Sequence, residues 1–254
     1  MSACGVGGNY DDFGCGTIFK LTPNGTGYSK RTIYAFKGAS DGANPWGDLL
    51  RDSSGNLYGT TRFGGTPYSC QYFGCGTVFK LSPASGRFKK LLLYSFNQQP
   101  QLGNSIAGLV LDAGGNLYGT VGYVMLGLGG VFKLTPSQKG PWGYSLLYLF
   151  QGGVDGSGPA APLILDGAGN LYGTTLAGGI CAPVNSGCGT VFKLAPANGG
   201  TYTESILYAF QGGSSDGQYP QAGLLLDPSG NLYGTTVLGG PCPNGCGVVF
   251  KLTP

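Results

Sequence analysis

The sequence repeats itself along its whole length, and this repetition limits the chain to folds built from similar modules. The triplet Phe-Lys-Leu begins at Phe19, Phe79, Phe132, Phe192 and Phe250. The motif Asn-Leu-Tyr-Gly-Thr begins at Asn56, Asn116, Asn170 and Asn231. Successive copies are 53 to 61 residues apart, as from Phe79 to Phe132 and from Asn170 to Asn231. Each module is therefore long enough for four short strands.

Each module contains four apolar runs that are separated by turn residues. In the C-terminal part of the chain these runs are 189–194, 205–210, 222–227 and 231–236. The gap between the last two is a hairpin turn, because Asp and Asn side chains bond to the turn backbone and Gly adopts positive φ. Apolar residues fall on both faces of runs such as 205–210, which predicts sheets that are covered on both sides. Four-stranded sheets stacked around an axis are the blades of a β-propeller.

The predicted fold is all-β, a β-propeller of four-stranded antiparallel blades with a repeat of ~58 residues. We expect one domain, 1–254, made of a partial repeat (1–44), full repeats (45–104, 105–158, 159–219) and a partial repeat (220–254). Four blades result if the strand at 28–37 completes the last sheet. In this four-blade arrangement the strand at 16–21 is left over, and an unpaired strand can recruit another molecule into a filament. Five blades, or an excerpt of a longer array, are the alternatives.

The eight cysteines form one pair in the long loop of each of four modules. The pairs are Cys4 with Cys15, Cys70 with Cys75, Cys181 with Cys188, and Cys242 with Cys246. The corresponding loop at 121–132 lacks both cysteines, as the loss of a bonded pair predicts. Zinc needs about four ligands, and the spacings differ from the Cys-x-x-Cys of a redox centre. We expect four disulfides and hence an oxidising compartment, with free thiols or a metal as alternatives.

The acidic residues fall mainly in turns. The chain has no histidine and one glutamate, Glu204. Aspartates that close the strand before each Asn-Leu-Tyr motif are expected to cap turns: Asp52, Asp112, Asp166 and Asp227. Aspartates in the links between modules are candidates for ligand or Ca²⁺ contacts, although calcium takes six to eight oxygens: Asp41, Asp155 and Asp216. We assign no catalytic residue, no metal site and no cofactor.

Some loop aromatic residues differ from module to module. Because loops on a rigid scaffold commonly carry binding sites, these residues are candidates for contacts with a surface glycan or a protein partner. They are Phe63, Tyr68, Tyr72, Phe73 and Tyr123.

Charge and hydropathy restrict the partners further. The net charge is +3 and the basic residues are spread singly, so the chain lacks the basic cluster of a nucleic-acid-binding protein. No apolar run approaches the ~18 residues of a membrane span. The first ten residues do not have the pattern of a signal peptide, so we expect that the signal was removed or that the chain is an excerpt.

Two families of repeats are similar to this pattern. The spacing Pro-x-x-Gly-Leu-x-x-Asp-x-x-Gly-Asn-Leu-Tyr, with a Gly-Gly-x-x-Asp-Gly link, is similar to the blades of NHL-repeat propellers. The core Gly-Asn-Leu-Tyr-Gly-Thr-Thr…Gly-Gly…Gly-Thr-Val-Phe-Lys-Leu resembles the GloVer tandem repeat of bacterial surface proteins, named for Gloeobacter and Verrucomicrobia. The resemblance covers essentially the whole chain. It implies an exported, often surface-anchored protein and brings no catalytic residues.

These observations predict a non-catalytic extracellular repeat protein for binding, adhesion or structural assembly at the cell surface, such as a glycan binder or a fibre component. The alternative is a secreted carbohydrate-active enzyme with carboxylates at the propeller centre, because glycoside hydrolysis generally uses two carboxylates. Three aspartates are not accounted for by turns: Asp11, Asp12 and Asp48.

Overall fold

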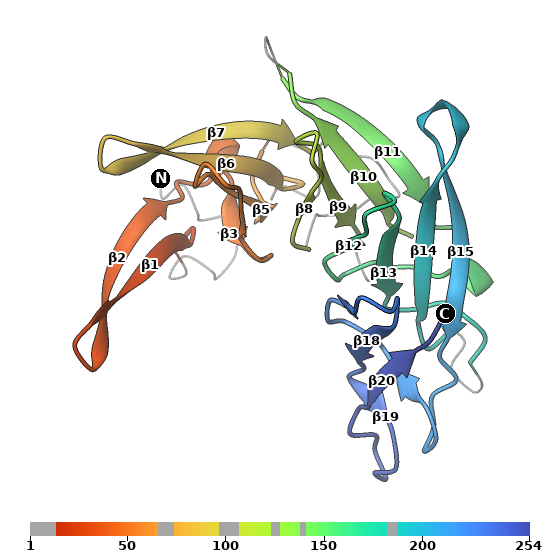
Figure 1. The fold of residues 1–254 in the computed structure, drawn as a ribbon. Helices are drawn as coiled ribbons and strands as arrows, with labels where there is room; N and C mark the ends of the chain where they lie inside the picture. The colour runs from red at the N-terminus through yellow and green to blue at the C-terminus, as the bar shows by residue number, and fades with distance from the viewer. Residues whose placement is uncertain (1–13, 66–73, 97–106, 123–127, 138–140, 182–186) are drawn as a thin grey trace. The chain divides into compact units, whose positions relative to one another are not determined.

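The computed structural model describes residues 14–65, 74–96, 107–122, 128–137, 141–181 and 187–254. These residues form β-strands and three short 3₁₀ turns, and no α-helix occurs among them, which confirms the all-β class (Figure 1). In this described part, no helix is long and apolar enough to cross a membrane. The chain divides into two compact units, Met1–Gln98 and Gln99–Pro254, and each is described by itself.

The first unit contains a two-stranded and a five-stranded antiparallel sheet. Strands β1 and β2 form the first sheet; β3, β5, β6 and β7 follow one another in the second, and β4 also pairs with β5. The bounds are β1 (Thr17–Asn24), β2 (Gly27–Ala35), the 3₁₀ turn η1 (Ala39–Asp41), β3 (Ala43–Pro45), β4 (Leu50–Arg51), β5 (Leu57–Phe63), β6 (Thr77–Ala84) and β7 (Arg87–Ser95).

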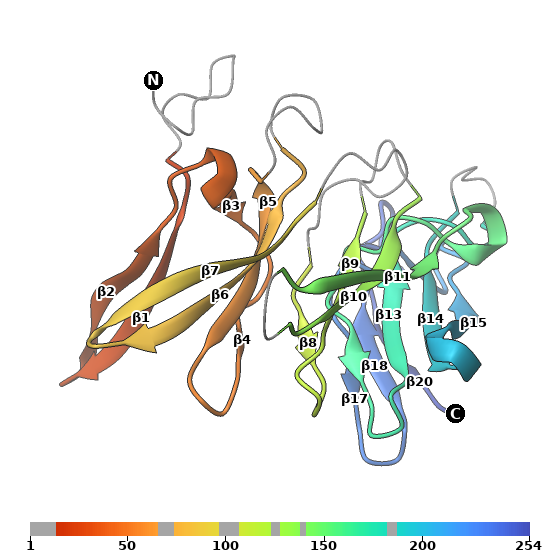
Figure 2. The ribbon, with the colours of Figure 1, turned by 90° about the horizontal axis from the view of Figure 1, so that it is seen from above.

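The second unit contains two four-stranded antiparallel sheets, β8-β9-β10-β11 and β12-β13-β14-β15 (Figure 2). A three-stranded sheet, β17-β18-β20, and the pair β16-β19 follow them. The bounds are β8 (Val110–Leu111), β9 (Leu117–Val121), β10 (Gly130–Thr135), β11 (Gly143–Leu149), η2 (Gly153–Asp155), β12 (Ile164–Leu165), β13 (Leu171–Thr175), β14 (Thr190–Pro196), η3 (Asn198–Gly200), β15 (Tyr202–Ala209), β16 (Gly217–Gln218), β17 (Leu225–Leu226), β18 (Leu232–Thr235), β19 (Leu238–Gly239) and β20 (Val249–Leu252).

A glycine at the same place in each sheet explains part of the repeated motif. In the sheet of β12 to β15, Gly173 lies opposite Phe192, and a Cβ at Gly173 would lie 2.6 Å from Cζ of that ring. The Phe192 side chain is completely buried. The Asn-Leu-Tyr-Gly-Thr motif therefore needs Gly at its fourth position because the phenylalanine of Phe-Lys-Leu packs across it.

The aspartate before the motif caps the hairpin turn. Asp166 accepts hydrogen bonds from the amide nitrogen of Asn170 at 2.9 Å, from its Nδ2 at 2.7 Å and from Tyr172 Oη at 3.1 Å. Burial raises the pKa of Asp166, but the hydrogen bonds from Asn170 outweigh it and hold the pKa below its usual range. The same bonds recur in the other three modules, at Asp52, Asp112 and Asp227.

The hydrophobic core of the second unit lies between successive sheets. One cluster joins Val131 and Phe150 of one sheet to Leu171 and Phe192 of the next. The rings of Phe150 and Phe192 meet edge to face, with centroids 5.0 Å apart. Sheets that pack face to face in this way have the arrangement expected of propeller blades.

The prediction that the strands are covered on both faces holds for the inner strands and is wrong for the outer ones. All five residues of β9 are buried. In the outer strand β15, exposed and partly buried residues alternate, and Leu207 is 41% exposed. One face of β15 is therefore not covered by another sheet.

The structure supports repeated antiparallel sheets but does not confirm the blade count. The described residues contain two four-stranded sheets and a three-stranded sheet in the second unit, and β2 pairs with β1 in the first. No closed sheet is formed among them. The four-blade ring, its five-blade alternative and the single domain at 1–254 stay predictions.

Candidate active site

In the first unit, an aspartate that follows one outer strand binds a lysine of the next sheet. Asp41 ends η1 and accepts hydrogen bonds from Tyr34 Oη at 2.6 Å and from the amide of Lys37 at 2.8 Å. Lys90 on β7 places Nζ 2.8 Å from Asp41 Oδ1 and also donates to the Asp41 carbonyl. Burial raises the pKa of Asp41, but hydrogen bonds from Lys90 and Tyr34 outweigh it and lower the pKa. This place in the module therefore holds an ion pair.

The second unit repeats the aspartate and its local contacts. Asp155 ends η2 and accepts hydrogen bonds from Tyr148 Oη at 2.7 Å and from the amide of Gln151 at 2.5 Å. The glycines on either side of η2 have positive φ, 74° at Gly152 and 100° at Gly156, as they do around η1. The carboxylate of Asp155 is thus held in a fixed orientation.

Strand register shows that Glu204 occupies the place of Lys90. Lys90 pairs with Leu81 across its sheet, and Glu204 pairs with Leu194, the corresponding leucine of the Phe-Lys-Leu triplet. Lys90 lies 49 residues after Asp41, and Glu204 lies the same distance after Asp155. A basic residue in one unit is therefore replaced by an acidic one in the other.

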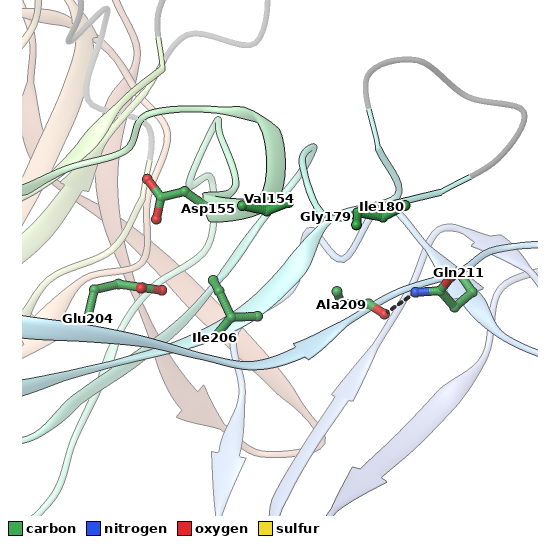
Figure 3. Close-up of a pocket in the computed structure, with 8 residues that line it drawn as sticks. All are labelled: Val154, Asp155, Gly179, Ile180, Glu204, Ile206, Ala209 and Gln211. Atoms are coloured by element: carbon green, nitrogen blue, oxygen red, sulfur yellow. Dashed lines mark hydrogen bonds between the residues drawn. The ribbon is translucent and has the colours of Figure 1, made fainter.

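Asp155 and Glu204 line one pocket, with a volume of about 420 Å³. Figure 3 shows Glu204, Ile206 and Ala209 along β15, with the 3₁₀ turn that carries Asp155 and the loop that carries Ile180 on the opposite side. The remaining lining residues are Val154, Gly179 and Gln211. Val154 is 65% exposed and Ile180 is 70% exposed, so apolar side chains frame the opening.

The pocket changes the acidity of Glu204. Burial, and then the negative charge of Asp155, raise the pKa of Glu204 to about 7. Glu204 Oε1 is buried and has no hydrogen-bond partner. A carboxyl group with this pKa is protonated in a large fraction of molecules at neutral pH, while a carboxylate that accepts two hydrogen bonds lies nearby.

This pair of groups can carry out general acid–base chemistry. A carboxyl group with a raised pKa donates a proton to a leaving oxygen, and a second carboxylate stabilises positive charge or activates water. The arrangement needs no histidine, which the chain lacks.

Comparison with known protein families identifies the family of the chain. The sequence profile of the Gloeobacter/Verrucomicrobia repeat matches residues 3–250. The chain belongs to this repeat family. The resemblance inferred from the repeated motifs is thereby confirmed, and the repeat family accounts for nearly the whole sequence.

Known proteins outside the family give a weaker comparison. No curated protein matches this repeat protein in sequence. Among solved structures, an endo-arabinase from Bacteroides thetaiotaomicron is 12% identical with a TM-score of 0.45, and the match covers 90% of this chain and 82% of the enzyme. A mutant of the GH43 protein BlXynB from Bacillus licheniformis is 12% identical with a TM-score of 0.41. The match covers 92% of this chain and 51% of BlXynB, so the repeat protein spans about half of that chain.

These neighbours require a correction to the predicted function. One is named an endo-arabinase and the other a GH43 protein, whereas a non-catalytic binding, adhesion or structural protein was predicted. That prediction is contradicted, and its carbohydrate-active alternative is favoured over it. That alternative placed the carboxylates at the propeller centre. The carboxyl pair described above lies beside β15, at one edge of its sheet, and not beside β12 at the other edge.

The structure places the predicted link aspartates as follows. Asp216 accepts hydrogen bonds from Tyr208 Oη and the amide of Gln211, as Asp155 does from its own tyrosine and glutamine. Among the described residues, no group of three or more His, Cys, Asp or Glu side chains is placed to hold a metal ion. Calcium contacts at Asp41, Asp155 and Asp216 stay a prediction.

Most of the aromatic contact candidates lie outside the described residues: Tyr68, Tyr72, Phe73 and Tyr123. Phe63 is at the end of β5, and the guanidinium of Arg62 lies 5.3 Å from its ring centroid. Its role in partner binding stays a prediction.

The cysteine pairs agree with the sequence where they can be seen. Cys181 bonds to Cys188, and Cys242 bonds to Cys246. Cys15 and Cys75 are also disulfide-bonded, and the partners predicted for them, Cys4 and Cys70, lie outside the described residues. Disulfides fit an oxidising compartment.

Glu204 is the functional candidate that the sequence reasoning missed. The sequence does contain a signal for Glu204, which is a difference between modules at one position. When the fourth strands of the modules are aligned, that position holds Lys30, Lys90, Tyr144 and Glu204. Repeated residues serve the architecture, so the residue that departs from the repeat is the one to examine. Its partner Asp155 is a repeated turn residue and gives no such signal.

Proposed function

We propose that this repeat protein is a secreted carbohydrate-active enzyme that hydrolyses glycosidic bonds at the pocket between Glu204 and Asp155. One observation carries the proposal: Glu204 faces Asp155 where Lys90 binds Asp41 in the first unit. Replacing a salt bridge with two acids costs stability, and such a cost is typical of functional sites.

In this mechanism Glu204 is the general acid. Its carboxyl group donates a proton to the oxygen of the leaving sugar while the glycosidic bond breaks. The anomeric carbon then bonds to the oxygen of a water molecule, which gives up its proton to the pair of carboxylates. The raised pKa keeps the proton available near neutral pH. Asp155 is the second carboxylate, and hydrogen bonds from Tyr148 Oη and the Gln151 amide fix its orientation.

The lining of the pocket suits a sugar ring. Ligand pockets combine apolar walls with a few polar groups, and here Val154, Ile180 and Ile206 supply apolar surface for the C–H faces of a ring. The neighbouring enzyme that is named an endo-arabinase makes arabinan the first substrate to test.

We also propose that the stacked sheets form a β-propeller and that the protein acts outside the cytoplasm. The face-to-face packing of successive sheets supports the first proposal. The disulfides Cys181–Cys188 and Cys242–Cys246 support the second, because disulfides persist in oxidising compartments.

The test is hydrolysis of arabinan, xylan and aryl glycosides by the whole chain. Glu204→Gln keeps the shape of the side chain and removes the acid, so we expect kcat on polysaccharides to fall by about 10²–10⁴-fold. Asp48→Asn removes one acidic group at an exposed position outside the pocket and serves as the matched control with unchanged activity.

The leaving group makes the test specific. An aryl glycoside whose phenol leaves without protonation bypasses a missing general acid, so Glu204→Gln is expected to retain most of its activity on a dinitrophenyl glycoside. If the wild-type protein hydrolyses none of these substrates, or if Glu204→Gln hydrolyses polysaccharides like the wild type, the proposed function is wrong.

A further inference from the structure

The first unit shows what the position beside the link aspartate can hold. The Lys90 ammonium contacts Asp41 and lies over three aromatic rings, at 5.6 Å from the centroid of Tyr34, 5.2 Å from Phe36 and 5.8 Å from Phe79. Charge-assisted hydrogen bonds and cation–π contacts together stabilise an ammonium group here.

The second unit has the same surroundings without a lysine. Tyr148 and Phe150 meet edge to face at 5.1 Å, and Phe150 meets Phe192 at 5.0 Å. The corresponding pairs around Lys90 have centroid distances of 5.2 and 5.3 Å. Asp155 has the position and the hydrogen bonds of Asp41. Three rings and a carboxylate are therefore arranged as they are around Lys90.

Glu204 adds a second acidic group to these surroundings. Its Oε1 is buried without a hydrogen-bond partner, and it shares a pocket with Asp155. A buried acceptor without a donor is costly, and a ligand that brings N–H donors and positive charge removes that cost. Next to the two acids, Val154, Ile180 and Ile206 give the pocket an aliphatic side.

We propose that this pocket binds a primary alkylammonium group, with the ammonium between Asp155 and Glu204 and the alkyl chain along Val154, Ile180 and Ile206. The ammonium of the ligand takes the place that the Lys90 ammonium has beside Asp41 in the first unit. An ammonium has three donors, enough for both carboxylates and for the Asp155 carbonyl. Binding does not depend on the proposed hydrolysis. If that function is correct, a bound ammonium holds Glu204 ionised and inhibits the enzyme.

The test is titration of the whole chain with n-butylammonium at low ionic strength. Isothermal titration calorimetry and NMR measure the binding. We expect saturable binding with one site in the wild type and no comparable binding of neutral n-butanol. Glu204→Gln removes one charged acceptor and is expected to weaken binding about tenfold or more. Asp48→Asn makes the same change in net charge elsewhere and is expected to bind like the wild type.

Glu204→Lys tests the comparison between the units directly. Its own ammonium is expected to fill the pocket as Lys90 does, so the variant folds and binds no n-butylammonium. The proposal is wrong if wild type and Glu204→Gln bind equally, if n-butanol binds as tightly, or if no saturable binding occurs. Absence of binding together with hydrolysis that requires Glu204 would overturn this inference alone; binding without hydrolysis would overturn the proposed function alone.

Discussion

The raised pKa of Glu204 predicts a pH dependence of stability that Glu204→Gln removes. The pKa of this group rises from its ordinary value of 4.5 to about 7 in the folded protein. Below pH 4.5 the group is protonated in both the folded and the unfolded state. Between pH 4.5 and 7 the folded protein keeps a proton that the unfolded chain releases, so the free energy of unfolding falls as pH rises. Above pH 7 the loss is complete.

The size of this loss follows from the two pKa values. The difference between 4.5 and about 7 corresponds to about 3 kcal/mol for a fully shielded group. Glu204 is only half-buried, and solvent screening reduces the value to about 1 kcal/mol. Glutamine has no proton to lose, so the advantage of wild type over Glu204→Gln is expected to shrink by about 1 kcal/mol between pH 4.5 and 8.

The assay is urea denaturation at several pH values. Trp142 lies in the second unit, and a Trp46→Phe background makes its fluorescence report that unit alone. Acidic groups that do not interact with Glu204 titrate equally in the two proteins, so the difference between them reports Glu204 together with its interaction with Asp155. A difference that is constant from pH 4.5 to 8, or that changes in the opposite direction, would refute the reasoning.

Three further predictions concern the modules. Gly173→Ala puts a Cβ 2.6 Å from Phe192 and is expected to cost about 1–3 kcal/mol of unfolding free energy, whereas Gly167→Ala, with no atom within 4 Å, costs less than about 0.5 kcal/mol; equal effects in urea denaturation would contradict the packing argument. Replacing Cys181 and its partner by Ser is expected to cost about 2–3 kcal/mol, measured by thermal unfolding, and an unchanged Tm would rule out a stabilising role for the disulfide. Asp166→Ala removes an acceptor of four hydrogen bonds and is expected to cost about 2 kcal/mol in the same assay, so a change below about 0.5 kcal/mol would show that the turn needs no cap.

The sequence was sufficient to predict the all-β class and the repeated antiparallel sheets, because each module repeats the residues that build them. Strand periods, the Asp-x-x-Gly-Asn turn and the paired cysteines are local features, and local features can be recognised in a single sequence. Blade number and ring closure could not be predicted in this way. They depend on which distant strands pair with one another. The residues of β1 and β2 do not by themselves indicate their pairing partners.

The candidate site was harder to predict because its two acids come from different elements. Asp155 caps a link, and its sequence neighbourhood is that of an ordinary Asp-Gly turn. Glu204 lies in an outer strand, 49 residues later. Only the register that puts Glu204 at the position of Lys90 shows that the two acids meet in one pocket.

The titration of Glu204 shows directly whether this pocket holds a carboxyl group with a raised pKa. Because Glu204 is the single glutamate of the chain, protein labelled with ¹³C-carboxyl glutamate gives one side-chain carboxyl signal that needs no further assignment. We expect a titration midpoint at about 7 in the wild type, shifted down when Asp155 is replaced by Asn. A midpoint near 4.5 would show that Glu204 is an ordinary solvated carboxylate, and would remove the general acid from this pocket.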